Sequence, residues 1–333
     1  MPDELVVAGG AVVPLEQLRA EVAAGLLDTA RTLKAASRAG STLNKYRRQW
    51  ANFEAWCARP EINVPARPAS EGTLIAFVAS LAQRDPMPAL STVQGYLAAI
   101  KWAHADVGLD YPGRAGLTEV MAGYTRIVGK RPRKQASALK LRQLRRILAP
   151  FDTTNPADVR DRVILLWGFA AGPRRSELAG VELAHITEDD DNGLVVLLPR
   201  SKGDQEGEGR ELVLTYGDHH ETCPVLAYRQ WIATSGIREG RLFRAVRKNG
   251  VIWGNGVTDQ VVADVMRDRA AAVGLPGFWS GHSMRRGFAT SGAEAGVPRH
   301  QIMKDGGWGS NAVDRYFEEG TRWEGRTVSK LGL

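Results

Sequence analysis

Residues 170–186, AAGPRRSELAGVELAHI, mark the place where one helix of this chain ends and the next begins. The preceding run, PADVRDRVILLWGFAAG at residues 156–172, is predicted to be helical. A Gly–Pro pair is expected to stop it, because glycine favours the end of a helix and proline suits the start of a new one. Arg174 and Glu177 then stand one turn apart, so the carboxylate can orient the guanidinium by a bidentate contact. Alternatively, Arg174 is a surface residue that caps its own helix.

The composition predicts a globular protein with two domains. The chain has 333 residues, of which 44% are hydrophobic and 24% are charged. It has no run of eighteen apolar residues, and its N-terminus lacks the features of a signal peptide, so we expect no membrane partner and a cytoplasmic location. Cys57 and Cys223 lie far apart without Cys or His neighbours at metal-ligand spacing, which predicts neither a disulfide framework nor a zinc site.

Positive charge is concentrated in one segment. Lys and Arg number 44 against 37 Asp and Glu, which gives a net charge of +7. Residues 123–150 contain no acid, and their basic residues are Arg126, Lys130, Arg131, Arg133, Lys134, Lys140, Arg142, Arg145 and Arg146. Such a segment favours a polyanion, because each neutralised phosphate releases condensed counterions. We therefore expect DNA or RNA as a partner, and the alternative is a solvated basic linker.

The apolar pattern predicts two domains joined by that basic linker. Residues 1–130 are expected to form a loosely specified arm and an all-α bundle, residues 131–138 the linker, and residues 139–333 a second domain with a C-terminal tail. The helices expected in the bundle read STLNKYRRQWANFEAWC, EGTLIAFVASLAQ and STVQGYLAAIKWAHADVG. The second domain is expected to be helical around one hairpin of strands at 194–199 and 211–216. The predicted fold class is mostly α with a small β-sheet.

One further motif can address an oxyanion. His282 and Arg285 are three residues apart in SGHSMRRGFAT, residues 280–290, so they share one face of a helix. Neither a GxxxxGK[ST] loop nor a GxGxxG after a strand is present, so no nucleotide cofactor is expected. The acidic run EDDD at residues 188–191 is more often solvated charge than a metal site. A single HxxR pair also arises by chance, so it has weight only in combination with other motifs.

The order of these motifs resembles the tyrosine recombinases, the phage integrase family, and especially their Cre-like members. AAGPRRSELAGVELAHI comes first, then the Ser-Lys pair of RSKGDQ between the two predicted strands, then SGHSMRRGFAT, and then GGW followed by a tyrosine. LFRAVRKNGV at residues 242–251 adds to the likeness. The resemblance covers nearly the whole chain. It implies a two-domain architecture, with an N-terminal helical core-binding domain that binds DNA and an α+β catalytic domain.

The resemblance also implies catalytic residues. In chain order they are Arg174, Glu177, Lys202, His282, Arg285, Trp308 and Tyr316. The two arginines would bind the phosphate with the glutamate in support, the lysine would protonate the leaving 5′ hydroxyl, and the histidine and the indole would add hydrogen bonds. The tyrosine would attack, and the histidine would accept its proton. Arg175 and Arg286 directly follow Arg174 and Arg285, and they would take over these roles if the motifs aligned one residue later.

The implied function is site-specific DNA recombination through a 3′-phosphotyrosyl intermediate. The partners would be double-stranded DNA with a specific recombination site and three further copies of the chain. The protein would be encoded by a bacterium or a phage and would work in the cytoplasm, associated with the nucleoid. Neither a cofactor, a metal nor ATP is expected. The basic residues expected to contact DNA are Lys45, Arg47, Arg48, Lys101, Arg131, Arg133 and Lys134. Trp323 in the tail is expected to pack on a neighbouring copy, unless the tail is a disordered end.

One spacing departs from the family pattern. Eight residues separate Trp308 from Tyr316, whereas Cre-like members place the tyrosine about one position later, where this chain has Phe317. Tyr316 is still the expected nucleophile, because no other tyrosine follows the HxxR motif and Gly309 is expected to let the loop absorb a deletion. The alternative is that the rings of Tyr316 and Phe317 belong to an apolar stripe in the core.

Two other functions stay open. One is a type IB topoisomerase, which shares the same chemistry but relaxes supercoils without exchanging strands. The other is a DNA-binding protein whose catalytic set has decayed, an alternative suggested by the tyrosine spacing.

Overall fold

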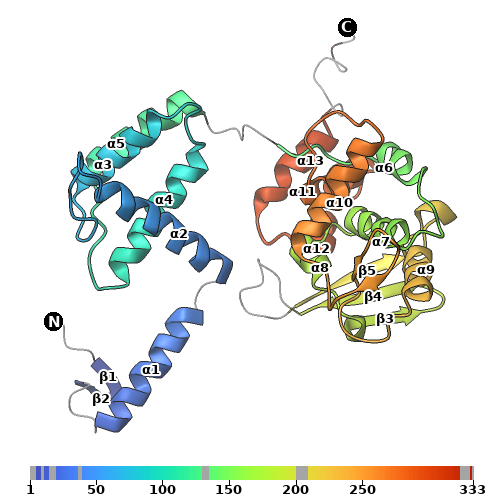
Figure 1. Ribbon diagram of the computed structural model, residues 1–333, viewed down its shortest axis with the longest axis horizontal. Coiled ribbons are helices and arrows are strands. Elements are labelled where there is room, and N and C mark those ends of the chain that lie inside the picture. Colours follow the sequence, from blue (N-terminus) through green and yellow to red (C-terminus); the bar gives the residue numbers. More distant parts are fainter. Residues whose placement is uncertain are drawn as a thin grey trace. The chain divides into compact units, whose positions relative to one another are not determined.

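The computed structural model describes residues 5–8, 11–14, 20–36, 40–129, 135–199, 209–322 and 331 (Figure 1). The chain divides into two compact units, Met1–Arg133 and Lys134–Leu333, and each is considered by itself. None of the helices within the described ranges is long and apolar enough to cross a bilayer. Some residues singled out in the sequence lie outside the described part. They are Lys130, Arg131, Arg133, Lys134, Lys202 and Trp323.

The first unit consists of helices preceded by a short hairpin. The strands β1 (Leu5–Ala8) and β2 (Ala11–Pro14) pair antiparallel within the predicted arm. The helices are α1 (Ala20–Ala36), α2 (Gly40–Cys57), α3 (Glu71–Ala82), α4 (Leu90–Ala105) and α5 (Ala115–Val128). α2 contacts α4, and α3 contacts α5. The sequence predicts α2, α3 and α4 but not α1 or α5.

The N-terminus of α5 is capped by a residue of another helix, which is why the sequence does not predict this helix. Glu71 Oε1, at the start of α3, accepts the amide N–H groups of Arg114 at 3.0 Å and of Leu117 at 2.9 Å. The first amides of a helix have no partner within the helix, so this carboxylate satisfies the N-terminus of α5. The partner is more than 40 residues away in the sequence. A search for a local capping residue therefore does not find it.

Aromatic rings fill the core of the first unit. Phe53 and Phe77 are buried and meet edge to face, with ring centroids 5.0 Å apart. His104 is also buried, and both ring nitrogens have partners. Its Nε2 accepts the amide N–H of Ala69 at 3.0 Å, and its Nδ1 lies 2.9 Å from the carbonyl oxygen of Ile100. His104 is therefore a structural residue, with the proton of its neutral ring on Nδ1.

The second unit is mostly helical with small sheets, so the predicted fold class is confirmed. Its helices are α6 (Leu141–Leu148), α7 (Pro156–Ala170), α8 (Arg175–Ala179), α9 (Pro224–Ser235), α10 (Asp259–Ala272), α11 (Gly281–Glu294), α12 (Arg299–Gly306) and α13 (Asp314–Gly320). Its strands are β3 (Ile186–Asp189), β4 (Gly193–Leu198), β5 (Arg210–Thr215), β6 (Ala245–Val246) and β7 (Ile252–Trp253).

The sheet of the second unit has one more strand than the predicted hairpin. β3, β4 and β5 form an antiparallel sheet in that order, with α9 against β5 (Figure 1). On its buried face Leu194 stands opposite Leu214, and Val196 opposite Leu212. The described residues also form two two-stranded sheets that the sequence does not predict, β1–β2 and β6–β7. β3 has the sequence ITED, and because two of its four residues are acidic, the apolar pattern does not predict it as a strand.

Charged side chains form a buried network between α7 and α10. Arg269 Nη2 lies 2.6 Å from Asp158 Oδ1 and 2.6 Å from Asp161 Oδ2. Arg160 Nη2 donates to the other oxygen of Asp161 at 2.6 Å. Asp158 and Asp161 are 8% and 4% exposed. Removing one cation from such a network leaves the negative charge of a buried carboxylate only partly neutralised, and this destabilises the fold.

We expect Arg269→Gln to lower the free energy of unfolding by about 3 kcal/mol, because two buried carboxylates lose a charged partner. Chemical denaturation of the full chain, followed by tryptophan fluorescence, measures the change. Arg229→Gln is the matched control, since Arg229 also contacts two carboxylates, Glu188 and Asp190, but at the surface, and its loss should have little effect. Equally small effects of the two substitutions would contradict a stabilising role for the network.

Candidate active site

Arg174 and Glu177 form one side of the candidate site, at the start of α8. Arg174 is the N-terminal cap residue, and Glu177 Oε2 accepts its amide N–H at 2.8 Å. Glu177 Oε1 accepts a hydrogen bond from Arg174 Nη1 at 2.5 Å. Burial raises the pKa of Glu177, but the hydrogen bonds from Arg174 and the charge of Arg210 outweigh it and hold the pKa below its ordinary value. The ionised carboxylate therefore orients the Arg174 guanidinium.

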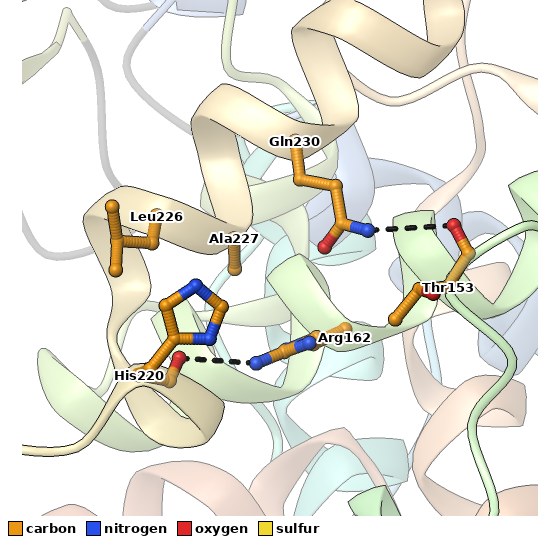
Figure 2. Close-up of a pocket in the computed structure, with 6 residues that line it drawn as sticks. All are labelled: Thr153, Arg162, His220, Leu226, Ala227 and Gln230. Atoms are coloured by element: carbon orange, nitrogen blue, oxygen red, sulfur yellow. Dashed lines mark hydrogen bonds between the residues drawn. The ribbon is translucent and has the colours of Figure 1, made fainter.

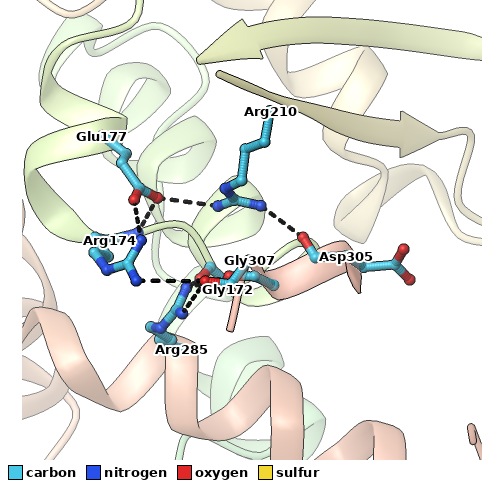
Figure 3. Close-up of polar contacts among 8 residues, drawn as sticks. Gly172, Arg174, Glu177, Arg210, Arg285, Asp305 and Gly307 are labelled. Atoms are coloured by element: carbon cyan, nitrogen blue, oxygen red, sulfur yellow. Dashed lines mark hydrogen bonds and ion pairs between the residues drawn. The ribbon is translucent and has the colours of Figure 1, made fainter. Parts of the chain in front are cut away.

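Arg285 reaches the same place from α11. Its Nη1 donates to the carbonyl oxygens of Gly172 and Gly306, the latter at 2.6 Å. Its Nη2 lies 3.4 Å from the carbonyl oxygen of Gly307, and Arg174 Nη2 also lies 3.4 Å from that oxygen. Two arginines that are far apart in the sequence therefore share one backbone acceptor (Figure 3).

A third arginine, Arg210, belongs to this cluster and is absent from the predicted residues. Its Nη2 donates to Glu177 Oε2 at 3.0 Å, and its Nη1 donates to the carbonyl oxygen of Asp305 at 2.7 Å (Figure 3). The sequence contains a signal for it, because side chains alternate along a strand and Arg210 is in phase with the buried Leu212 and Leu214. A charged side chain on the buried face of a strand requires partners.

The cluster contains more positive than negative charge. The guanidinium groups of Arg174 and Arg210 contact the carboxylate of Glu177, and Arg285 is close enough to be influenced by all three charges. Burial lowers the pKa of Arg285 to about 9, with the charges of Arg174 and Arg210 acting in the same direction and the charge of Glu177 opposing them. An anion that enters the cluster would relieve this repulsion. The arrangement is therefore suited to bind a phosphate or another oxyanion.

The Gly-Gly-Trp sequence brings the backbone close to the arginines. Gly307 has a φ of 63°, and a Cβ there would lie 2.7 Å from Arg210 Nε. A Cβ at Gly306 would lie 1.8 Å from the Trp308 ring. That ring lies against Arg285, whose Cζ is 3.7 Å from the ring centroid. Both glycines are therefore needed, Gly306 for space and Gly307 for space and backbone conformation.

The expectation that Gly309 has the special backbone conformation was wrong. Gly307 follows the last residue of α12 and has the left-handed conformation that glycine favours at this position. Gly309 lies outside the left-handed region, and a Cβ added there meets no atom within 4 Å.

The Tyr316 ring is a core residue whose hydroxyl contacts an exposed side chain. Tyr316 is 4% exposed and packs in a small apolar cluster with Val313, against which Phe317 is partly buried. The Tyr316 hydroxyl lies 2.5 Å from Nη2 of Arg315, which is exposed. The ring centroids of Tyr316 and Trp308 are 6.4 Å apart. The fold therefore brings Tyr316 next to the indole that lies against the arginine cluster.

His282 lies in the first turn of α11, close to several positive charges. Partial desolvation lowers the pKa of His282, and the charges of Arg285 and Arg315 lower it further. Its pKa is therefore below the ordinary value of 6.5, and the imidazole is neutral at pH 7. A neutral imidazole can accept a proton. Lys202, the remaining predicted catalytic residue, lies outside the described residues.

Four of the basic residues predicted to contact DNA are exposed on the first unit. Lys45, Arg47 and Arg48 are on α2, and Lys101 is on α4, the helix that packs against α2. Their contact with DNA stays a prediction.

A separate pocket of about 400 Å³ lies between α7 and α9 in the second unit (Figure 2). Its lining residues are Thr153, Arg162, His220, Leu226, Ala227 and Gln230. Arg162 Nη2 already donates to the carbonyl oxygens of His220 at 3.1 Å and Glu221 at 2.7 Å. The pocket shares no residue with the arginine cluster.

We expect Gly307→Ala to lower the free energy of unfolding by at least about 1 to 2 kcal/mol, because a side chain there strains the left-handed backbone and also meets Arg210. Gly309→Ala is the matched control, since a methyl group there meets open space. Chemical denaturation of both variants measures the difference. Equal stability of the two variants would show that the conformation at position 307 is not required.

We expect the His282 imidazole to titrate below pH 6.5, because positive neighbours oppose its protonation. Protonation of His282 should accordingly oppose folding as the pH falls below 6.5. NMR titration of the six histidines, with His282→Gln to assign the signal, measures the midpoint. Arg315→Gln should raise this midpoint and Arg229→Gln should leave it unchanged. A midpoint at or above 6.5 would contradict the described environment.

Comparison with known proteins identifies relatives along most of the chain. The model of the "Phage integrase family" matches residues 137–319. An "Integrase/recombinase xerD homolog" of Selenomonas ruminantium is 28% identical and is aligned over 89% of this chain and 86% of its own length. The "Recombinase cre" of Escherichia phage P1 is 25% identical over 92% of this chain and 91% of its own length.

Solved structures show the same fold. A lambda integrase (75–356) dimer bound to a COC′ core site has a TM-score of 0.60 at 13% identity and is matched over 89% of this chain and 95% of its own. The Tn1549 transposon integrase in complex with transposon right end DNA has a TM-score of 0.60 at 15% identity, over 91% and 98% of the two chains. The family model spans more than half of the sequence, and the fold agrees. This chain belongs to the phage integrase family, the tyrosine recombinases.

Proposed function

We propose that this chain is a site-specific DNA recombinase that cuts and rejoins DNA through a covalent bond between a 3′ phosphate and Tyr316. The observation that carries the proposal is the convergence of Arg174 and Arg285 on the carbonyl oxygen of Gly307, next to Trp308 and Tyr316. The relatives described as recombinases and integrases support the same class of reaction.

The arginine pair binds the phosphate in this proposal. A phosphodiester has one negative charge on its nonbridging oxygens, and more charge gathers on them in the transition state. The planar guanidinium groups of Arg174 and Arg285 each match two oxygens, and Glu177 holds the first of them in place. Phosphate oxygens replace the Gly307 carbonyl oxygen as the shared acceptor. These fixed cations supply the charge stabilisation that metal ions supply in many other phosphoryl-transfer enzymes.

Tyr316 is the nucleophile in the proposed reaction. Its hydroxyl oxygen bonds to phosphorus while the bond from phosphorus to the 5′ oxygen breaks. His282 accepts the phenol proton, which its lowered pKa permits at neutral pH. Lys202 donates a proton to the departing 5′ oxygen. The phosphotyrosine retains the energy of the phosphodiester, so a second 5′ hydroxyl can reverse the reaction without ATP.

We propose that the chain acts as a tetramer on two DNA sites. Exchange between two duplexes requires cleavage of four strands, and each copy of the chain supplies one Tyr316, so four copies act on two sites. The partner is double-stranded DNA with a specific recombination site, held by the exposed basic residues of the first unit and by the basic linker. The working location is the cytoplasm, where bacterial and phage DNA is found.

We expect the chain to form a covalent adduct with a nicked duplex. The nick lets the fragment with the free 5′ hydroxyl diffuse away after cleavage, so the 3′ phosphate stays bonded to the tyrosine. Target sites are first enriched from a pool of randomised duplexes by binding to Tyr316→Phe, which lacks the nucleophile. Adducts are then counted on denaturing gels with labelled DNA. Tyr316→Phe should abolish the adduct, and Phe317→Leu should retain it.

The same substrates separate the rival functions. The absence of an adduct with the parent chain would refute catalysis and leave a DNA-binding protein. An adduct that depends on Phe317 rather than on Tyr316 would refute the assignment of the nucleophile. Relaxation of a supercoiled plasmid without any recombinant product from two sites would indicate a topoisomerase.

A further inference from the structure

We propose that Arg210 is a positioning residue for DNA cleavage, which acts through Glu177 and through the end of α12. The inference rests on the proposed function, because it concerns how the phosphate-binding arginines are held. Arg210 is the first residue of β5 and joins this strand to α8 and α12.

The first contact fixes the carboxylate that orients Arg174. Arg210 Nη2 donates at 3.0 Å to Glu177 Oε2, the same oxygen that accepts the Arg174 amide N–H at 2.8 Å. Glu177 Oε1 is thereby directed to Arg174 Nη1 at 2.5 Å. The terminal torsion of a glutamate is soft. Without Arg210 the carboxylate would rotate more freely, and the guanidinium of Arg174 would move with it.

The second contact fixes the backbone that holds Arg285. Arg210 Nη1 donates at 2.7 Å to the carbonyl oxygen of Asp305, in the last turn of α12. Carbonyl groups at a helix C-terminus lack partners within the helix, and a cation is favourable there. The next two residues, Gly306 and Gly307, supply carbonyl oxygens to Arg285. Arg210 therefore supports both phosphate-binding arginines at once.

The environment of Arg210 fits a supporting role better than direct contact with phosphate. The Arg210 side chain is 14% exposed, and that of Glu177 is 2% exposed. Both terminal nitrogens of Arg210 already have protein acceptors, and its guanidinium lies against Gly307. A planar guanidinium can reach two acceptors in fixed directions, which a lysine ammonium cannot do in the same way.

Single-turnover cleavage of the enriched nicked duplex tests this inference. We expect Arg210→Gln to lower the rate at saturating DNA by about 10- to 100-fold, because small displacements of catalytic groups have effects of this size. DNA affinity should change by less than about threefold, since a positioning residue acts on the transition state more than on binding. Arg210→Lys should also lose rate although it keeps the charge. Arg229→Gln, the surface control, should cleave at the parental rate.

A double substitution tests the route of action. If Arg210 acts through Glu177, then adding Arg210→Gln to a Glu177→Gln chain lowers the rate by a much smaller factor than it does in the parent chain. Thermal unfolding of each variant gives the temperature range in which the second unit stays folded, and rates are compared within that range. A residue with only a structural role would change the unfolding temperature and leave the rate at saturating DNA unchanged.

The outcomes separate this inference from the proposed function. Parental cleavage rates in Arg210→Gln or in Arg210→Lys would overturn the positioning role while the parent chain still forms its adduct. If Arg210→Gln lowers the cleavage rate by the same factor in the parent chain and in the Glu177→Gln chain, the route through Glu177 is overturned. A parent chain that forms no adduct would overturn the proposed function, and the inference with it.

Discussion

Three arginine side chains lie close together, two of them on the carboxylate of Glu177 and the third on backbone carbonyl groups, and the rest of the candidate site depends on this concentration of positive charge. Arg174, Arg210 and Arg285 are drawn together by Glu177 and by backbone carbonyl groups. Unit charges 4 Å apart interact by about 4 kcal/mol near a protein surface. Carbonyl oxygens have only partial negative charge, so they compensate this repulsion incompletely. The fold maintains a cluster that an anion would stabilise, and a DNA phosphate has the matching charge and geometry.

The end of α12 connects this cluster to Tyr316, the proposed nucleophile. Two glycines let the backbone pass close to the arginines, and the Trp308 ring that follows contacts both Arg285 and the Tyr316 ring. The apolar environment of Tyr316 holds the ring, while the hydroxyl contacts an exposed arginine. A buried ring and a nucleophilic hydroxyl are therefore compatible roles of one residue. The short spacing between Trp308 and Tyr316 still brings the two rings into contact.

Local patterns predict much of the fold but not the contacts that complete it. Helical spacing predicts α2, α3 and α4. It also correctly places Arg174 and Glu177 at the start of α8, and His282 and Arg285 on α11. Features whose partners are far away in the sequence are not predicted by such patterns. Arg210 is identified by acceptors on α8 and α12, and α5 is capped from α3. Gly307, not Gly309, has the left-handed backbone, because that choice depends on where α12 ends.

The central claim is that Arg174 and Arg285 bind one DNA phosphate within reach of residue 316. A crystal structure of the Tyr316→Phe chain bound to a duplex with its enriched target site tests this claim most directly. We predict a single backbone phosphate between the two guanidinium groups, in the place where the Gly307 carbonyl oxygen is now their shared acceptor, with the ring of residue 316 facing its phosphorus. Bound DNA that leaves both arginines on that carbonyl, with no phosphate between them, would contradict the account.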